Sequence, residues 1–525
     1  MDKALLESSL CEKKQQPLIM IAGAIGVLLL ICLSVALKVD DIRDNTGAPN
    51  IEASYHALLT IKALDQGSAN DHFYLPSVSL AGKINKGIPW GATIPGRGGN
   101  YIYTSYPSPG FVVPLGFLNV FNLEITLENL ANFNFFLGAI SSLLLYFFLF
   151  ELFYRSGTSQ KTVVISASVS SVISIFSYEA MLSHGIVYWS QSLSQVILVL
   201  FLFLLLRYFK AVKSGSDTQK KYLPFLLGLA FLMPYTEWTG YIFNTGVIFC
   251  CWFKRFESVA YRHLAFYVLI FTFLAGIFTI LHYCLISNLE DVVNAFYDRF
   301  FSRNLSKGSF IALLYGYVVS YSLFLVAVFV GLFFLALQKM TSKTDLSLFK
   351  PMFLLASFPL LENVIMLQHA SQFSFDRLKL MIPLAMLLSL ALINISRKQQ
   401  VMLTILIVCS AFFGHSSYMD ERAKYLDWNR IDKENKRFAK DVASLVDPEC
   451  AVYATNNSVR GYINLLFDHG IYEWKSYNQA MELTQQRDGC ASVYIKTKLV
   501  LTDLPQILSI TLTNRQGQRA QLKYN

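Results

Sequence analysis

The chain alternates long apolar stretches with short polar connections. Several of the apolar stretches approach about 20 residues, the length of helix that spans a bilayer. The pattern therefore predicts an α-helical polytopic membrane protein with about 11 transmembrane helices. These segments are 17–37, 128–153, 162–180, 187–209, 222–235, 240–253, 263–285, 309–337, 351–368, 378–395 and 400–415. The fifth and sixth form a tight pair around "PYTEWTG" (234–240), and a broken hairpin there would leave the alternation of sides unchanged.

Composition agrees with this pattern. Apolar residues make up 54% of the chain and charged residues only 15%, whereas about a quarter of a soluble protein is charged. The net charge of +9 is not a nucleic-acid signal, because most of the excess lies in short loops. There it sets the orientation of the helices in the membrane.

Basic residues collect on one set of loops, which the positive-inside rule places in the cytoplasm. The N-terminus (1–16) is then cytoplasmic, and the extracytoplasmic regions are a long loop (38–127), a middle loop (286–308) and a C-terminal domain (416–525). We expect residues 17–415 to form the transmembrane domain, in the inner (plasma) membrane. A cleavage site at Ser34-Val35-Ala36 is an alternative, but the apolar run is long for a signal peptide.

The C-terminal region, 416–525, reads as a small α/β domain. Strands are predicted at 450–455 and 491–504, and helices at 435–446 and 461–470. Cys450 and Cys490 lie here and are either a disulfide, if the region is exported, or two buried thiols. The other six cysteines are packing residues in or beside apolar segments: Cys11, Cys32, Cys250, Cys251, Cys284 and Cys409.

Three carboxylates, Asp40, Asp41 and Asp44, follow directly on the first apolar segment. A solvated acidic helix exit is the simpler interpretation. However, the loop 38–127 is too long for a plain connection, and its turn formers and aromatic residues suit a lid over a membrane-surface cavity. A carboxylate at a fixed helix end beneath such a lid is well placed as a general base.

The segment "YTSYPSPGFVVPLGFLNVF" (103–121) is apolar, too short to span, and broken by proline and glycine. We expect it to lie along the outer interface with its aromatic rings at headgroup level. Such a surface would guide a lipid-linked substrate, and Tyr106 is counted among the substrate-binding candidates. A simple connector between loop and helix is the alternative.

Basic residues in the outer loops are the candidates for phosphate binding. Arg299 and Arg303 share one helical face, and Arg377 and Lys379 follow His369. Internal ion pairs with Asp298, Glu290 or Asp376 are the alternative. His369 is either a proton shuttle or a hydrogen-bonded structural residue. Three glutamates at predicted outer membrane ends, Glu179, Glu237 and Glu362, are expected to face a polar cavity.

Together these features resemble the GT-C superfamily of integral-membrane glycosyltransferases, in particular bacterial protein-mannosyltransferase-like and aminoarabinose-transferase-like members. The resemblance lies in the architecture and in "YTEWTGY" (235–241) and "HA…FSFDRLK" (369–379). It implies a polyprenyl-phosphate-linked sugar as donor and a lipid, glycan or protein as acceptor. No cofactor is implied, although some members use a divalent metal.

The resemblance also implies that one aspartate beyond the first helix is the catalytic base. Many members have Asp-Glu at this point, whereas this chain has Asp-Asp followed by Arg43. The choice among Asp40, Asp41 and Asp44 therefore stays open, with Asp41 preferred. Basic residues would then stabilise the departing phosphate.

Two other classes remain open. A transporter would be polytopic too, but internal repeats and mid-membrane charges are more typical of it, and the sequence has no evident repeat. A non-catalytic polysaccharide-assembly or export protein would tolerate the loss of all three aspartates. The C-terminal region contains no nucleotide-binding loop, Cys/His metal spacing or nucleophile elbow.

Overall fold

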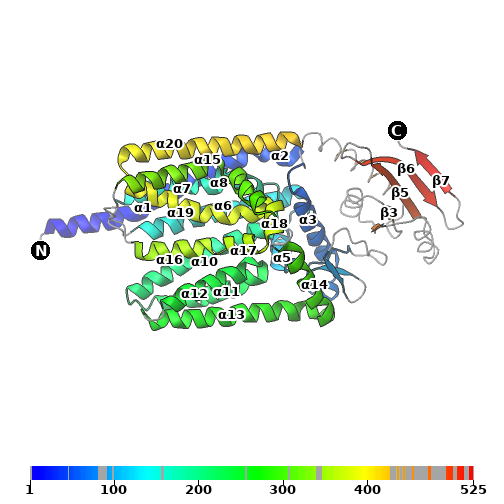
Figure 1. Cartoon of the computed structure of the whole chain (residues 1–525), viewed down its shortest axis with the longest axis horizontal. Helices are drawn as coiled ribbons and strands as arrows, with labels where there is room; N and C mark the ends of the chain where they lie inside the picture. The colour runs from blue at the N-terminus through cyan, green and yellow to red at the C-terminus, as the bar shows by residue number, and fades with distance from the viewer. Residues whose placement is uncertain are drawn as a thin grey trace. The chain divides into compact units, whose positions relative to one another are not determined.

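The computed structural model describes residues 3–44, 47–80, 92–96, 100–154, 159–254, 257–304, 308–338 and 346–425, four single residues (433, 437, 440 and 444), and five strands of the C-terminal region (Figure 1). The chain divides into two compact units. Unit 1 comprises Met1–Asp44, Ala131–Ile277 and Phe300–Glu421. Unit 2 comprises Asn45–Leu130, Phe278–Arg299 and Arg422–Asn525.

Unit 1 is a bundle of α-helices whose long members lie side by side (Figure 1). Helix α10 packs against α11, α15 against α19, and α7 against both α19 and α1. The helices are α1 (Lys3–Ala36), α2 (Val39–Asp44), α6 (Leu127–Phe153), α7 (Gln160–Ser171), α8 (Ile173–Phe176), α9 (Tyr178–Ser183), α10 (Ser190–Lys213), α11 (Gln219–Thr236), α12 (Thr239–Phe253), α13 (Val259–Cys284), α15 (Phe310–Leu337), α16 (Leu346–Ser357), α17 (Leu360–Ile365), α18 (Leu367–Gln372), the 3₁₀ helix η3 (Ser374–Leu380), α19 (Met381–Asn394) and α20 (Arg397–Lys424).

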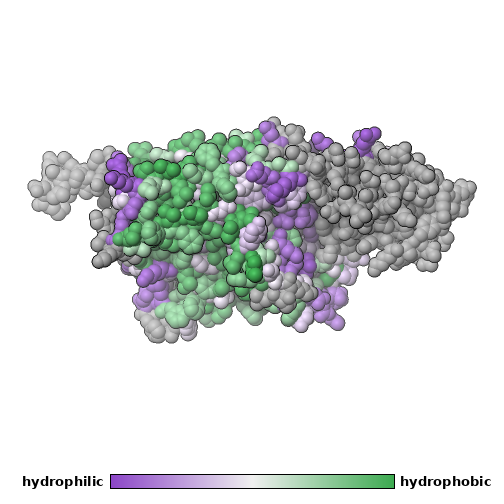
Figure 2. Space-filling model, turned by 45° about the horizontal axis from the view of Figure 1, so that its top comes forward, coloured by the Kyte–Doolittle hydropathy of each residue, from purple (hydrophilic) through white to green (hydrophobic). Residues whose placement is uncertain are grey.

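The bundle has the surface of a membrane protein. Hydrophobic residues cover most of the face of the helical part shown in Figure 2, and hydrophilic residues gather at its edges. Within the described residues, seven helical stretches are long and apolar enough to cross a membrane: Leu18–Ala36, Leu127–Phe153, Ser190–Lys213, Val259–Cys284, Phe310–Leu337, Leu346–Ile365 and Arg397–Lys424. The prediction of a polytopic helical membrane protein is therefore confirmed.

The number of 11 transmembrane helices is not confirmed. Helices occupy all 11 predicted positions, but those at 162–180, 222–235, 240–253 and 378–395 are shorter, interrupted or less apolar than a full span. The first of these is divided into α7, α8 and α9. Ser171 Oγ donates to the Ala167 carbonyl, and the Ser177 side chain accepts a hydrogen bond from Ala180 N at the start of α9. Serine side chains compete in this way for backbone groups and favour helix ends.

The tight pair predicted around "PYTEWTG" is the hairpin of α11 and α12. Only two residues separate these helices. The helices approach so closely at Gly240 that a Cβ there would lie 2.2 Å from the Pro234 main-chain nitrogen. The close crossing therefore depends on glycine at this position.

Unit 2 contains most of the described residues of the predicted loop 38–127. Besides the C-terminal strands, its elements are α3 (Ile51–Gln66), α4 (Ala69–His72), β1 (Thr93–Pro95), β2 (Tyr101–Tyr103), α5 (Pro109–Val120) and α14 (Leu289–Arg303), whose last four residues belong to unit 1. Strands β1 and β2 are antiparallel. A small core joins them to the start of α14 through Leu75, Ile94, Ile102, Tyr283, Ile286 and Val292. Residues 81–91 and 97–99 of the predicted lid lie outside the described residues.

Five strands of the C-terminal region form one sheet in the order β4-β3-β5-β6-β7. They are β3 (Val452–Ala454), β4 (Ile471–Glu473), β5 (Ser492–Leu499), β6 (Pro505–Thr513) and β7 (Arg519–Lys523). Strand β3 is parallel to β4 and β5, and the other pairs are antiparallel. Two of these strands overlap the predicted ones. The predicted helices at 435–446 and 461–470, and both Cys450 and Cys490, lie outside the described residues or on isolated positions of them.

Candidate functional site

Helix α2 carries the three aspartates. It begins three residues after the end of α1, so the acidic segment follows directly on the apolar helix as predicted. The Asp40 side chain is exposed. The side chains of Asp41 and Asp44 lie outside the described part of the structure, so their assignment as the base stays a prediction.

A cluster of charged side chains is buried in unit 1, in the segments that connect its helices. Its first pair is Arg377, from η3, and Glu179, from α9, with the Arg377 Nε 3.6 Å from Glu179 Oε2. Ser320 of α15 bridges the two, because its hydroxyl donates to Glu179 at 2.8 Å and accepts from Arg377 Nε at 2.9 Å. Ser183 Oγ also donates to Glu179, at 2.5 Å. These hydrogen bonds satisfy two charges that burial would otherwise destabilise.

The second pair is Lys379 and Glu362. The Lys379 amine donates to the Glu362 carboxylate and to Asn363 Oδ1 at 3.2 Å. Glu362 also accepts from the Thr239 hydroxyl at the start of α12. Glu237 is fully buried beside this pair, and its Oε2 accepts from Thr239 N at 3.2 Å. Burial, together with the neighbouring Glu362 charge, raises the pKa of Glu237 well above its usual range.

The third pair is His369 and Asp376. His369 Nδ1 contacts Asp376 Oδ2, and Gln191 Nε2 donates to Asp376 Oδ1 at 2.7 Å. Burial by itself favours the neutral acid, but contacts with His369 and the charge of Lys379 outweigh it and hold the pKa of Asp376 below its usual value. Burial lowers the pKa of His369, and the carboxylate of Asp376 opposes that shift. Asp376 is therefore ionised, and its hydrogen bond fixes the orientation of the imidazole ring.

The 3₁₀ helix η3 brings these pairs together. In a 3₁₀ helix the residues i and i+3 lie on the same side, so Asp376 and Lys379 share one face while Arg377 points elsewhere. The Arg377 carbonyl accepts from Tyr321 Oη at 2.7 Å. Tyr321 directly precedes Ser322, whose backbone is left-handed (φ 36°) and kinks α15 at this level. The irregular backbone thus lies where α15 contacts the charged cluster.

The structure gathers four predicted site residues, His369, Arg377, Lys379 and Glu237, in this cluster. Arg377 and Lys379 are both in internal ion pairs, although their partners are Glu179 and Glu362 rather than the acids expected from the sequence. Their charges are thereby balanced within the protein. Substrate binding by these residues stays a prediction.

Three further candidate site residues lie outside the charged cluster or at its edge. Arg303, at the end of α14, is half-buried, and its charge acts on His369 and Asp376. Arg299 and Tyr106 belong to unit 2. There Arg299 Nε donates to Ser105 Oγ at 2.6 Å, and Tyr106 is buried with its carbonyl 3.4 Å from Tyr283 Oη.

Several contributors to the cluster were not predicted from the sequence. Ser183, Gln191, Ser320 and Tyr321 are ordinary helix residues by sequence, and only their burial in apolar surroundings would have drawn attention to them. Among the residues that the structure describes, no group of three or more His, Cys, Asp or Glu side chains is arranged to hold a metal ion.

The comparisons with known proteins rest on structure alone. No protein-family model matches the sequence, and no curated protein matches it either. ArnT from Cupriavidus metallidurans bound to undecaprenyl phosphate superposes with a TM-score of 0.59 at 10% sequence identity, covering 94% of this chain and 97% of that one. The same protein in the apo state gives a TM-score of 0.57 at 10% identity, with 96% and 99% coverage.

A second protein shares the fold. The archaeal oligosaccharyltransferase AglB from Archaeoglobus fulgidus, in complex with an inhibitory peptide and a dolichol-phosphate, gives a TM-score of 0.53 at 10% identity. The match covers 92% of this chain and 70% of AglB. The chain has the GT-C fold. The GT-C resemblance seen in the sequence is thereby confirmed at the level of the fold.

Two features of the chain now stand together. A membrane helix is followed directly by an acidic helix, and three ionic contacts are buried near the helix ends, of which Glu179–Arg377 joins residues far apart in sequence. At 10% identity, the neighbours do not assign the roles of these residues.

Proposed function

We propose that the protein is an integral-membrane glycosyltransferase that moves a sugar from a polyprenyl-phosphate donor to a lipid, glycan or protein acceptor. The observation that carries this proposal is the GT-C fold, shared over nearly the whole chain with ArnT, whose structure holds undecaprenyl phosphate. AglB, with dolichol-phosphate bound, supports the same donor class. The reaction would take place on the extracytoplasmic side, which the distribution of basic residues predicts.

The reaction is a displacement at the anomeric carbon of the sugar. The acceptor oxygen forms a bond to this carbon while the bond from the carbon to the phosphate oxygen breaks. An aspartate of α2, with Asp41 preferred over Asp40 and Asp44, takes the proton of the acceptor hydroxyl as it attacks. The polyprenyl phosphate leaves with the bonding electrons and so gains one negative charge, and the aspartate becomes neutral.

The growing charge on the phosphate needs cationic groups. Arg303 lies at the edge of the cluster and is half-buried, so solvent reaches it. Arg377 and Lys379 are buried and paired. We propose that these ion pairs hold the two positive charges in fixed positions before substrate binds. Such preorganised charges need no rearrangement during the reaction.

The test combines gene deletion with single substitutions. Mass spectrometry of the cell envelope after deletion is expected to show the loss of one glycosyl unit, which the wild-type gene restores. Asp41→Asn removes the basicity of the carboxylate with little change in shape and should lower restoration by at least about a hundredfold. The same substitution at Asp40 and Asp44 identifies the base.

The matched control is Asp65→Asn, which changes an exposed aspartate of α3 and should restore the glycosyl unit fully. Full restoration by the Asn variants of Asp40, Asp41 and Asp44 alike would overturn the aspartate-base mechanism. An unchanged envelope glycan profile after deletion would instead overturn the proposed glycosyl transfer itself.

A further inference from the structure

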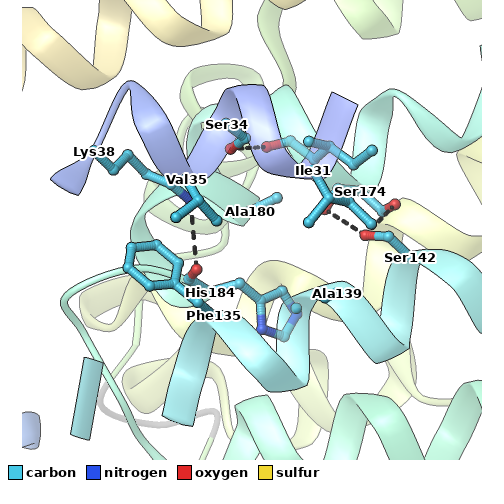
Figure 3. Close-up of a pocket in the computed structure, with 12 residues that line it drawn as sticks. Ile31, Ser34, Val35, Lys38, Phe135, Ala139, Ser142, Ser174, Ala180 and His184 are labelled. Atoms are coloured by element: carbon cyan, nitrogen blue, oxygen red, sulfur yellow. Dashed lines mark hydrogen bonds between the residues drawn. The ribbon is translucent and has the colours of Figure 1, made fainter. Parts of the chain in front are cut away.

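Lys38 is buried at the point where α1 ends and the acidic α2 begins. A lysine just beyond a membrane helix usually extends its amine toward water or lipid headgroups. Here the side chain turns inward, and the residue is 3% exposed. Its amine donates to the His184 carbonyl at 3.4 Å and lies 4.7 Å from the centre of the Phe135 ring (Figure 3). A methionine would fill this space without the cost of burying an amine.

The receiving carbonyl belongs to a turn that is held from both sides. The Nδ2 atom of Asn134, in α6, lies 2.9 Å from the carbonyls of Ser183, Gly185 and Val187. The His184 carbonyl, in the same run, accepts from Lys38. Side chains from two places, Lys38 after α1 and Asn134 in α6, therefore donate to carbonyl oxygens of the same turn.

The His184 side chain does not take part in this tether. The residue is 3% exposed, and neither ring nitrogen has a hydrogen-bond partner among the described residues. The ring packs on α6 at Gly138, where a Cβ would lie 2.7 Å from the His184 Cβ. Close packing of this ring brings the main chain of the turn within reach of Lys38.

The same turn leads into the charged cluster. It begins at the C-terminal end of α9, the helix that carries Glu179. Ser183 is the last residue of α9. Its hydroxyl donates to Glu179, and its carbonyl accepts from Asn134. Glu179 in turn pairs with Arg377. A short chain of contacts thus runs from the start of the acidic helix, through Lys38 and the turn, to the buried ion pair.

We infer that Lys38 is a positioning residue of the proposed glycosyl transfer: by tethering the start of α2 to the turn 183–187, it fixes the aspartate base relative to the Glu179–Arg377 pair. The inference rests on the proposed function. Lys38 contacts no substrate in this account and acts through the helix that follows it. Its loss would let the base shift, and a displacement of about 1 Å can cost about a hundredfold in rate.

The test separates turnover from binding. Lys38→Met removes the donor and keeps the length of the side chain, Lys38→Arg keeps a donor, and Ser34→Ala is the control. Ser34 lines the same pocket, where its hydroxyl makes only a long contact, 3.5 Å, to the Ile175 carbonyl. Each purified variant is checked for a monodisperse profile by size-exclusion chromatography. Transfer is measured in cells as the rate at which the missing glycosyl unit reappears, and binding is measured with undecaprenyl phosphate.

Lys38→Met should lower the transfer rate by at least about tenfold, while its affinity for undecaprenyl phosphate stays within about twofold of the wild type. Lys38→Arg should recover most of the rate, and Ser34→Ala should match the wild type. If Lys38→Met does not fold, Asn134→Ser replaces it, because it loosens the same turn from α6 and should show the same separation. A normal rate in Lys38→Met, or in Asn134→Ser where it is used, overturns the inference, as does a loss confined to lipid-phosphate affinity.

The aspartate variants and the deletion distinguish failure of the positioning role of Lys38 from failure of the proposed function. If Asp41→Asn, or the Asn variant of Asp40 or Asp44, abolishes transfer and Lys38→Met does not change it, only the positioning role is wrong. If the deletion itself leaves the envelope unchanged, the proposed function is wrong.

Discussion

At the scale of single residues, the buried charges of unit 1 are stabilised by their partners. Glu179 has no exposed side-chain surface, and Arg377 has 9%. Removing one member of such a pair leaves an uncompensated charge in a medium that solvates it poorly. This makes the Glu179–Arg377 pair more sensitive to substitution than pairs at the surface.

Glu179→Ala should lower the free energy of unfolding by about 3–5 kcal/mol, because Arg377 then stays buried without its counter-charge. The control is Glu151→Ala, which breaks a partly exposed pair with Lys210 at 3.0 Å and should cost at most about 1 kcal/mol. Thermal unfolding of both variants in the same detergent compares them. Equal losses would contradict the importance assigned to the buried pair.

The amine of Lys38 makes stability depend on pH. Burial lowers the pKa of Lys38 from 10.5 to about 7 in the folded protein. Below pH 7 both folded and unfolded chains carry the proton, and the full cost of burying the charge applies. Between about pH 7 and 10.5 only the unfolded chain keeps it, so stability rises with pH across this window.

Comparing the wild type with Lys38→Met isolates this effect. The difference in melting temperature between the two should shift in favour of the wild type as pH rises from 7 to 10. His184 does not contribute in this window, because burial lowers its pKa to about 3 and it is neutral throughout. A difference that is constant from pH 7 to 10 would show that Lys38 does not change its charge there.

At the scale of elements, the positions of helices were predictable from apolar runs, but their interruptions were not. The run 162–180 reads as one helix, whereas the structure divides it where Ser171 and Ser177 bond to the backbone. The run 351–368 likewise becomes parts of α16, α17 and α18. Hydropathy does not register these local hydrogen bonds, and the short segments α9, α17, α18 and η3 carry most of the charged cluster.

The α11–α12 hairpin gives a test at this scale. Gly240→Ala places a Cβ 2.2 Å from a main-chain atom of Pro234, so the helices must separate, at a cost of about 1–3 kcal/mol. Gly228→Ala is the matched control, because Gly228 lies in α11 with open space around it. It should be neutral or stabilising by up to about 1 kcal/mol. Thermal unfolding that ranks the two variants in the opposite order would contradict the close crossing.

At the scale of the whole molecule, the sequence predicted the class of protein and its GT-C architecture, because both follow from the order of apolar helices and polar regions. It also singled out His369, Arg377 and Lys379, which are unusual charges near predicted membrane ends. It did not predict that Arg377 pairs with Glu179 and Lys379 with Glu362. Such pairings depend on how distant helices pack, and no local pattern encodes them.

The central claim is that sugar moves from a polyprenyl phosphate to an acceptor with an aspartate of α2 as base. The most direct measurement uses the purified protein in proteoliposomes with lipid extracted from wild-type cells. The account predicts release of one polyprenyl phosphate for each glycosyl unit gained by the acceptor, and loss of both in Asp41→Asn or in the Asn variant of Asp40 or Asp44. Equal release by the wild type and all three variants, or transfer without release of the lipid phosphate, would contradict it.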